Sequence, residues 1–171
     1  GIPSSMIYYN ELFRAYDVDT IIRIGTAGSM QENIKLHDIV IATSACSESS
    51  INDNLFANIN FSPTPDFDLM LETYNKSLEL GYTTHCGQVH SSDQFYNELP
   101  EGVFKNLRKY GVLCVEMESY GLFMTARKYG KKGLGIFTIS DSLVEDVSDS
   151  AENREKSYTN MMNLALEVAH E

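Results

Sequence analysis

Two patterns of apolar and polar positions alternate along the chain. Short apolar runs rich in Ile and Val end at glycine or polar residues, and longer segments between them repeat apolar positions every three or four residues. The short runs are typical of buried β-strands, and the longer segments are typical of helices that bury one face. The pattern predicts strands in residues 19–25, 37–45, 84–92, 111–117 and 132–142, helices in residues 4–16, 66–81, 100–111, 118–130 and 149–171, and a long loop in residues 47–68.

The alternation of strands with helices predicts the fold class. We expect an α/β fold with a largely parallel or mixed sheet, formed by residues 1–171 as a single domain. The last helix should bury a stripe of Met161, Leu164, Ala165 and Val168. Such folds bind ligands at strand ends. The informative segments are therefore the strand-to-loop junctions IRIGTAGS, VHSSDQFYN, CVEMES and FTISDS.

Composition narrows the range of functions. The net charge of −11 over 171 residues argues against a nucleic-acid-binding surface, although a small phosphate ligand needs only a local cluster of donors. Cys46, Cys86 and Cys114 show no C-x-x-C spacing and the four histidines show no metal-ligand spacing, so we expect reduced thiols and no metal site. No apolar run approaches the ~20 residues that span a bilayer. From Gly1 onward the chain reads as mid-protein sequence, which predicts a fragment with its N-terminal part missing.

The first junction places Arg23 inside an apolar strand, where a guanidinium needs a partner. A bound phosphate is one solution, because the guanidinium fork matches its oxygens. Gly25 and Gly28 would let the backbone approach such an anion closely, and Thr26 would supply a hydroxyl. The alternative is a structural ion pair with an acid such as Asp38, and the junction alone favours this alternative.

Glu116 and Glu118 are two carboxylates at the junction CVEMES. Side chains two positions apart on a strand face the same side, so both carboxylates should emerge at a strand tip. There they would suit hydrogen bonds to sugar hydroxyls. For Glu118, which stands at the start of a predicted helix, attraction to the helix dipole is an equally good explanation.

The other two junctions offer an acid and two aromatic rings. Asp141 follows Ser140 at the end of a predicted strand, where an aspartate can act as a general acid. A helix cap or an Asx turn is the usual role of such a Ser-Asp pair. Phe95 could stack on a planar ring, whereas core packing is favoured for Tyr96.

In this order, the segments IIRIGTAGS, SSDQFYN, GVLCVEMES, FTISDS and AENR resemble the purine nucleoside phosphorylases of the hexameric bacterial type, in the nucleoside phosphorylase/hydrolase superfamily. The resemblance runs from GIPS at the start of the chain to the last helix. It implies a three-layer αβα fold, with a mixed central sheet flanked by helices and with the N-terminal part missing.

The resemblance also implies a role for each junction. Asp141 matches the general acid that protonates the purine, and Arg154 matches the arginine that pairs with this acid. The other matched positions are Arg23 and Thr26 for phosphate, Glu116, Met117 and Glu118 for ribose, and Ala27, Gly28, Phe95, Val115 and Ser140 for the base.

The implied activity is phosphorolysis of purine (deoxy)ribonucleosides to the free base and (deoxy)ribose 1-phosphate. Inorganic phosphate would be the co-substrate, and no metal or organic cofactor would be needed. The implied protein is a cytoplasmic homo-oligomer, a hexamer built as a trimer of dimers, with no nucleic-acid or membrane partner. Two features depart from the family. The chain lacks its N-terminal Gly-Asp-Pro-x-x-Arg loop and the arginine and histidine that reach a neighbouring subunit's site, and Ser142 follows Asp141 where many relatives have histidine.

Three other functions stay open at this point. A uridine phosphorylase of the same fold would carry a pyrimidine-reading insertion after the aromatic residue, and FYNELPEGVF is too short to contain it. A nucleosidase would use water in place of phosphate, and Arg23 argues against this. A non-catalytic binding or assembly module would not need the set of Glu118, Asp141 and Arg154.

Overall fold

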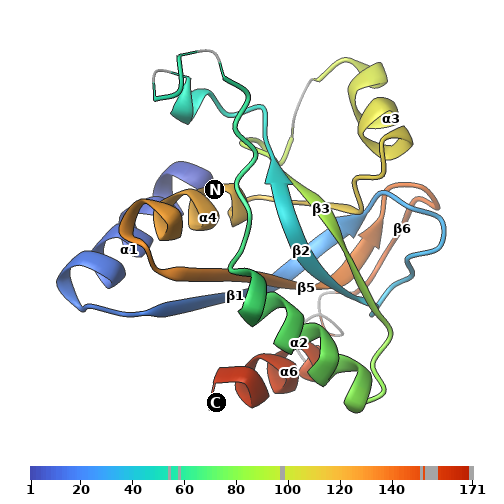
Figure 1. The fold of residues 1–171 in the computed structure, drawn as a ribbon. Helices are drawn as coiled ribbons and strands as arrows, with labels where there is room; N and C mark the ends of the chain where they lie inside the picture. The colour runs from blue at the N-terminus through green and yellow to red at the C-terminus, as the bar shows by residue number, and fades with distance from the viewer. Residues whose placement is uncertain (54, 58, 97–98, 151, 153–157, 170–171) are drawn as a thin grey trace.

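The computed structural model describes residues 1–53, 55–57, 59–96, 99–150, 152 and 158–169 (Figure 1). The strands are β1 (Thr20–Ser29), β2 (Ile39–Cys46), β3 (Thr84–Ser91), β4 (Cys114–Glu116), β5 (Lys132–Ser142) and β6 (Val147–Ser148). The helices are α1 (Ile2–Ala15), α2 (Phe67–Glu79), α3 (Glu101–Lys109), α4 (Ser119–Tyr129) and α6 (Thr159–Ala169), with a 3-10 turn η1 (Ser50–Asn52).

The strands form a mixed sheet that closes on itself. Its order is β1-β4-β3-β2-β5-β6, and β5 also pairs with β1. The pairs β1–β5, β2–β3 and β3–β4 are parallel, whereas β1–β4, β2–β5 and β5–β6 are antiparallel. Because β1 pairs with both β4 and β5, residues of these three strands meet at one end of the sheet.

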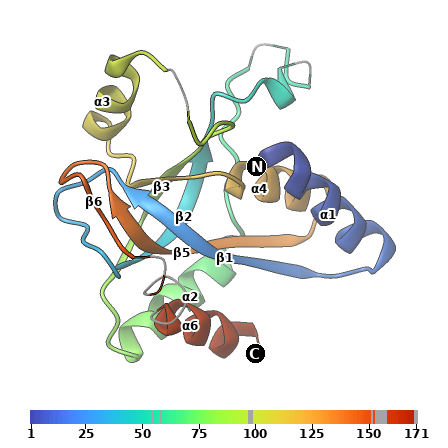
Figure 2. The ribbon, with the colours of Figure 1, turned by 180° about the vertical axis from the view of Figure 1, so that it is seen from behind.

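Two pairs of helices cover the sheet on different sides (Figure 1). α1 and α4 pack together on one side, and α2 and α6 pack together on the other, as the reverse view also shows (Figure 2). α3 lies apart from both pairs, beyond the end of β3. This arrangement confirms the predicted α/β class with a mixed sheet between helical layers. No helix of the described residues is both long and apolar enough to cross a membrane.

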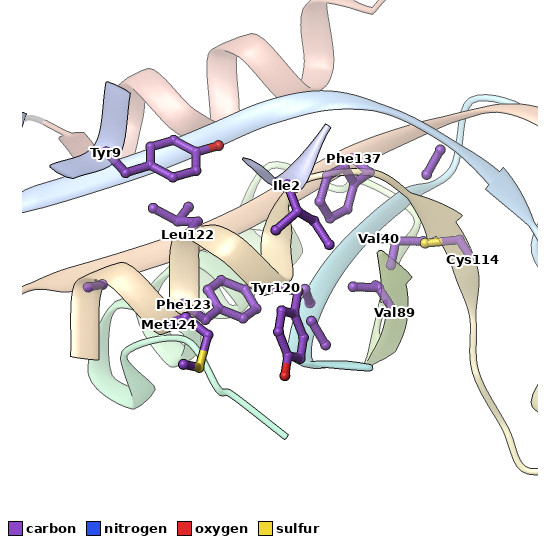
Figure 3. Packing of buried hydrophobic residues seen from close by; sticks show 14 of the residues in the cluster. Ile2, Tyr9, Val40, Val89, Cys114, Tyr120, Leu122, Phe123, Met124 and Phe137 are labelled. Atoms are coloured by element: carbon purple, nitrogen blue, oxygen red, sulfur yellow. The ribbon is translucent and has the colours of Figure 1, made fainter. Parts of the chain in front are cut away.

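Strand β5 shows why the sheet supports two cores. Its side chains alternate between the two faces. Phe137 and Ile139 pack on the α1–α4 side, and Leu134 and Ile136 pack on the α2–α6 side. All four are buried, and Figure 3 shows the first core, where side chains of α1 and α4 meet those of the strands. A strand that is buried on both faces reads as a near-continuous apolar run, which is the pattern that predicted this strand.

The prediction matches the structure where an element carries its own signals. β5 has the predicted bounds, and Asp66 caps α2 through a hydrogen bond from the Leu69 amide. Gly81 and Gly130 follow α2 and α4 with φ values of 73° and 63°, which glycine adopts without steric cost. The predicted stripe of the last helix is buried; it consists of Met161, Leu164, Ala165 and Val168.

Other elements differ from their predicted bounds. β1 continues past Gly25 to Ser29, because the small residues there pair with β5 although they include no large apolar side chain. β4 begins only at Cys114, after a turn at Gly111 with φ of 85°. β6 was not predicted. The last helix does not include residues 149 and 150, and part of its predicted start lies outside the described residues.

Candidate active site

Residues predicted to bind the base meet across three strands. Gly28 of β1 lies opposite Val115 of β4 and opposite Asp141 of β5. A Cβ atom on Gly28 would lie 3.4 Å from Cγ1 of Val115, so the two strands approach closely here. The pairing of β1 with β5 shifts register between Ala27 and Gly28. The structure therefore brings Ala27, Gly28, Val115, Ser140 and Asp141 to one end of the sheet.

Arg23 lies on the same strand, and its guanidinium is held between two carboxylates. Nη2 of Arg23 donates a hydrogen bond to Oε2 of Glu118, and Nη1 lies 3.3 Å from Oε2 of Glu116. The guanidinium carbon lies 4.9 Å from the ring centroid of Phe137, within the range of a cation–π contact. The structure thus joins the predicted phosphate-binding arginine to the predicted ribose-binding glutamates.

Asp38 is not the partner that the sequence suggested for Arg23. Its carboxylate accepts a hydrogen bond from the Lys35 amide and lies 3.0 Å from Nε2 of His85. The ion-pair interpretation of Arg23 is therefore right in kind and wrong in its partner, because the acids come from β4 and from the turn that follows it.

Gly25 makes room for the guanidinium of Arg23. A Cβ atom at this position would lie 3.1 Å from Nη1, 3.3 Å from Nη2 and 3.4 Å from Cζ of Arg23. The two distances to the nitrogens are shorter than ordinary van der Waals contact between such atoms. The missing side chain at position 25 therefore lets the arginine lie close against β1.

The two glutamates lie at different depths. The side chain of Glu116 has no exposed area, whereas that of Glu118 is 19% exposed. The carboxylate of Glu116 accepts hydrogen bonds from the Ser91 hydroxyl and from the amides of Glu118 and Ser119. Met117, between the two glutamates, is partly exposed. The sequence predicted both carboxylates at the strand tip. Glu116 is the last residue of β4, Glu118 follows just beyond it, and both face Arg23, but only Glu118 is exposed to solvent.

Glu118 occupies the N-cap position of α4 but makes no side-chain capping hydrogen bond among the described residues. Burial by itself would raise the pKa of its carboxyl group. The Arg23 guanidinium beside it lowers this pKa below its ordinary value. The contacts of Glu118 are thus those of an ion pair, and attraction to the helix dipole does not account for them.

Asp141 and Ser140 are joined by a hydrogen bond. The Ser140 hydroxyl lies 2.5 Å from Oδ2 of Asp141 and donates to it. Both residues belong to β5, so the alternative role as a helix cap is wrong. Arg154, which was predicted to pair with Asp141, lies outside the described residues. Thr26 is exposed on β1, opposite Thr138 of β5.

The aromatic residues lie on the loop that follows β3. Phe95 is 76% exposed and Tyr96 is 90% exposed. Their rings meet edge to face, with centroids 5.1 Å apart. Core packing of Tyr96, which the sequence favoured, is therefore wrong. The exposed face of Phe95 leaves it available for stacking on a planar ligand.

Glu48 ties this loop to the sheet, and the sequence did not single it out. Its Oε1 accepts hydrogen bonds from the Ser92 hydroxyl at 2.8 Å and from the Asp93 amide at 2.9 Å. Burial by itself would raise the pKa of Glu48, but backbone amides, the Ser92 hydroxyl and nearby His90 lower it overall. The two partners lie 44 and 45 positions away in the sequence, so no local pattern could have revealed this anchor.

A hollow of about 550 Å³ opens beside Tyr120 in the first turn of α4, and its described lining includes none of the predicted site residues. It lies along the loop after β2. The chemistry of the predicted residues therefore belongs to the strand ends, not to this hollow. The hollow is lined by Cys46, Ser47, Ser49, Asn52, Asp53, Phe56, Ile59, Asn60, Phe61, Ser62 and Tyr120.

Comparison with known proteins agrees with this architecture. The family described as the Phosphorylase superfamily matches residues 1–170. A DeoD-type purine nucleoside phosphorylase of Thermoanaerobacter sp. (strain X514) is 46% identical over 169 residues, which are 99% of this chain and 72% of that protein. DeoD-type purine nucleoside phosphorylases of Clostridium perfringens (strain SM101 / Type A) and Listeria monocytogenes serotype 4a (strain HCC23) are 44% and 43% identical over the same shares. The resemblance found in the sequence is thereby confirmed, and the chain belongs to the Phosphorylase superfamily, in the family of the DeoD-type purine nucleoside phosphorylases.

Proposed function

We infer that this protein is a purine nucleoside phosphorylase, which transfers the pentosyl group of a purine (deoxy)ribonucleoside to inorganic phosphate. The observation that carries this inference is the direct pairing of Arg23 with Glu118, which starts from the strand β1 whose Gly28 lies opposite Asp141. β1 thus links a group suited to bind an anion, through its partner, to a group suited to bind a sugar, and it pairs with the strand that carries the acid. Relatives at 43–46% identity carry the same name.

The residues divide the reaction between them. Arg23 and Thr26 hold the phosphate, whose oxygen attacks the anomeric carbon, because a guanidinium fork fits phosphate oxygens. The bond from that carbon to the purine nitrogen breaks, and its electron pair passes into the base. The sugar develops oxocarbenium character, as in other glycoside cleavage, and the phosphate anion stabilises it.

Acid catalysis completes the step. Asp141 gives a proton to a ring nitrogen of the departing purine, which makes the base a better leaving group. Arg154 pairs with this aspartate and assists the transfer. Glu118 and Met117 fix the ribose, with Glu116 close by, while Phe95, Val115, Ala27, Gly28 and Ser140 surround the base. No metal or organic cofactor takes part, and the active protein is a cytoplasmic homo-oligomer, a hexamer built as a trimer of dimers.

An assay of the purified protein with inosine, adenosine and uridine, each with and without phosphate, tests this function. We expect release of hypoxanthine or adenine that depends on phosphate and is accompanied by pentose 1-phosphate. Release of uracil would instead identify a uridine phosphorylase. Base release without phosphate would identify a nucleosidase, and no release from any nucleoside would identify a non-catalytic module.

A further inference from the structure

We propose that Glu116 is a positioning residue that holds Arg23 and Glu118 in place from the buried side of the site and does not itself bind the ribose. The inference rests on the proposed function of the site and assigns Glu116 a different part in it from that of Glu118. Three observations carry it: the burial of its carboxylate among donors of the protein, its contact with the inner side of the guanidinium, and its hydrogen bonds to the start of α4.

The carboxylate of Glu116 is occupied by donors of the protein and closed to solvent. Oε1 accepts from the Ser91 hydroxyl and lies 3.1 Å from the Ser119 amide nitrogen. Oε2 lies 2.9 Å from the Glu118 amide nitrogen and 3.0 Å from that of Ser119. Three donors thus take up most of the about four lone-pair sites that a carboxylate offers, and Nη1 of Arg23 faces Oε2 at 3.3 Å as an opposite charge. The side chain of Glu116 has no exposed area, so it offers no surface to a sugar hydroxyl.

The same carboxylate fixes the inner half of the guanidinium. Nη1 of Arg23 is buried and has no hydrogen-bond partner among the described residues, and Glu116 is the charge that faces it. Nη2 is directed to the partly exposed Glu118. A buried charge is tolerated only when an opposite charge or hydrogen bonds compensate it. Glu116 therefore sets where the arginine lies and leaves Nη2 for exchange with a ligand.

The hydrogen bonds that Glu116 accepts from the start of α4 fix the backbone of Glu118. By accepting the amides of Glu118 and Ser119, Glu116 satisfies donors at the helix start that would otherwise lack partners. The Ser91 hydroxyl links the two elements, since it donates to Glu116 and accepts from the Tyr120 amide at 2.9 Å. One buried side chain thus connects the phosphate side of the site with its ribose side.

Phosphate binding measured by calorimetry without nucleoside separates the two roles of Glu116. In Glu116→Gln we expect the Kd for inorganic phosphate to rise roughly tenfold, because the guanidinium of Arg23 is no longer held in the position that presents Nη2 to the ligand. We also expect the KM for nucleoside to rise while the ratio of KM for inosine to that for 2′-deoxyinosine stays at the wild-type value. A direct ribose ligand would give the reverse, with phosphate affinity unchanged and this ratio altered, and that result would overturn the inference.

Asp66→Ala is the control, because Asp66 caps α2 through the Leu69 amide and alanine removes this cap. It should lower Tm as a lost helix cap does and leave phosphate affinity unchanged. If both variants lowered Tm alone, Glu116 would be a structural cap only and the inference would fail.

Ser91→Ala keeps the test decisive if Glu116→Gln does not fold. It should weaken phosphate and nucleoside binding together by a few-fold, and unchanged binding of both would overturn the inference. Because phosphate binding is read without turnover, a protein that binds phosphate but does not cleave nucleosides would contradict only the proposed function.

Discussion

Arg23 and Glu118 stand 95 positions apart in the sequence, and Nη2 of the arginine donates directly to Oε2 of the glutamate. Arg23 comes from the middle of β1, and Glu118 stands at the N-cap of α4. The group that would bind phosphate and the group that would bind ribose therefore neutralise each other. A phosphate that accepts a hydrogen bond from Nη2 must displace the carboxylate of Glu118. This carboxylate can then accept hydrogen bonds from the sugar hydroxyls.

Replacing Glu118 by Gln should affect the two substrates in opposite directions. The KM for nucleoside should rise roughly ten- to hundredfold, because a hydrogen bond to a charged group is lost. Phosphate should bind more tightly without nucleoside, because the amide no longer competes for Nη2 of Arg23. Steady-state kinetics and calorimetry measure the two effects. A variant that changed only Tm would instead support the helix-dipole explanation of Glu118.

Gly25→Ala tests the close packing of the arginine against its own strand. The added methyl would lie 3.1 Å from Nη1 of Arg23, so the guanidinium must shift by a few tenths of an ångström from its place between the two carboxylates. We expect the KM for phosphate to rise about tenfold through the displaced hydrogen bonds, with a smaller change for nucleoside. Gly102→Ala in α3 is the control, because nothing lies within 4 Å of its added methyl. Equal phosphate KM values for the two variants would contradict the packing argument.

Asp141→Asn should leave nucleoside binding largely intact and lower kcat by roughly 10²–10⁴-fold, the loss typical of a missing general acid. The amide keeps the shape of the side chain and can still meet the Ser140 hydroxyl. Ser140→Ala should lower kcat much less, since it removes a hydrogen-bond partner and leaves the acid. Turnover of a natural purine nucleoside by Asp141→Asn at a near-normal rate would exclude Asp141 as the acid.

Local signals were enough to predict most of the fold. β5 is apolar on both faces, and α2 has its own cap and terminal glycine, so neither needs knowledge of distant residues. The end of β1 needed such knowledge. Its residues past Gly25 are small and include no large apolar side chain, and only pairing with β5 makes them a strand.

The site was predictable in its residue types and not in its contacts. The sequence identified Arg23 as needing an acid, but the acid depends on how β1 pairs with β4, which no local pattern encodes. For the same reason, the fact that Glu116 is buried and Glu118 is partly exposed could not be predicted from their separation of two positions. Tyr96 was assigned to the core because aromatic residues usually are buried, and the loop after β3 places it in solvent.

His90 should make stability depend on pH in the weakly acidic range. It is 3% exposed at the end of β3, with Nδ1 3.8 Å from the Cys46 thiol and its ring edge to face with Phe104. Burial lowers the pKa of His90 below its ordinary value of 6.5, against the opposing effect of the negative charges of Glu48 and Glu116. The folded protein therefore holds this imidazole neutral at a pH where the unfolded chain already protonates it.

The sign of the effect follows from this difference. Where the unfolded state binds more protons, stability rises with pH. The free energy of unfolding should thus fall as pH drops below about 6.5 and level off once the folded His90 also takes a proton, with a slope from this one group of at most about 1.4 kcal/mol per pH unit. Urea unfolding at pH 7.5, 6.5, 5.5 and 5.0, run on wild type and on His90→Gln, measures it. His90→Gln should lose less stability over this range than wild type. His85→Gln, on the same strand, is the control and should still show the loss of stability that His90 causes. Parallel curves for wild type and His90→Gln would show that His90 protonates equally in both states.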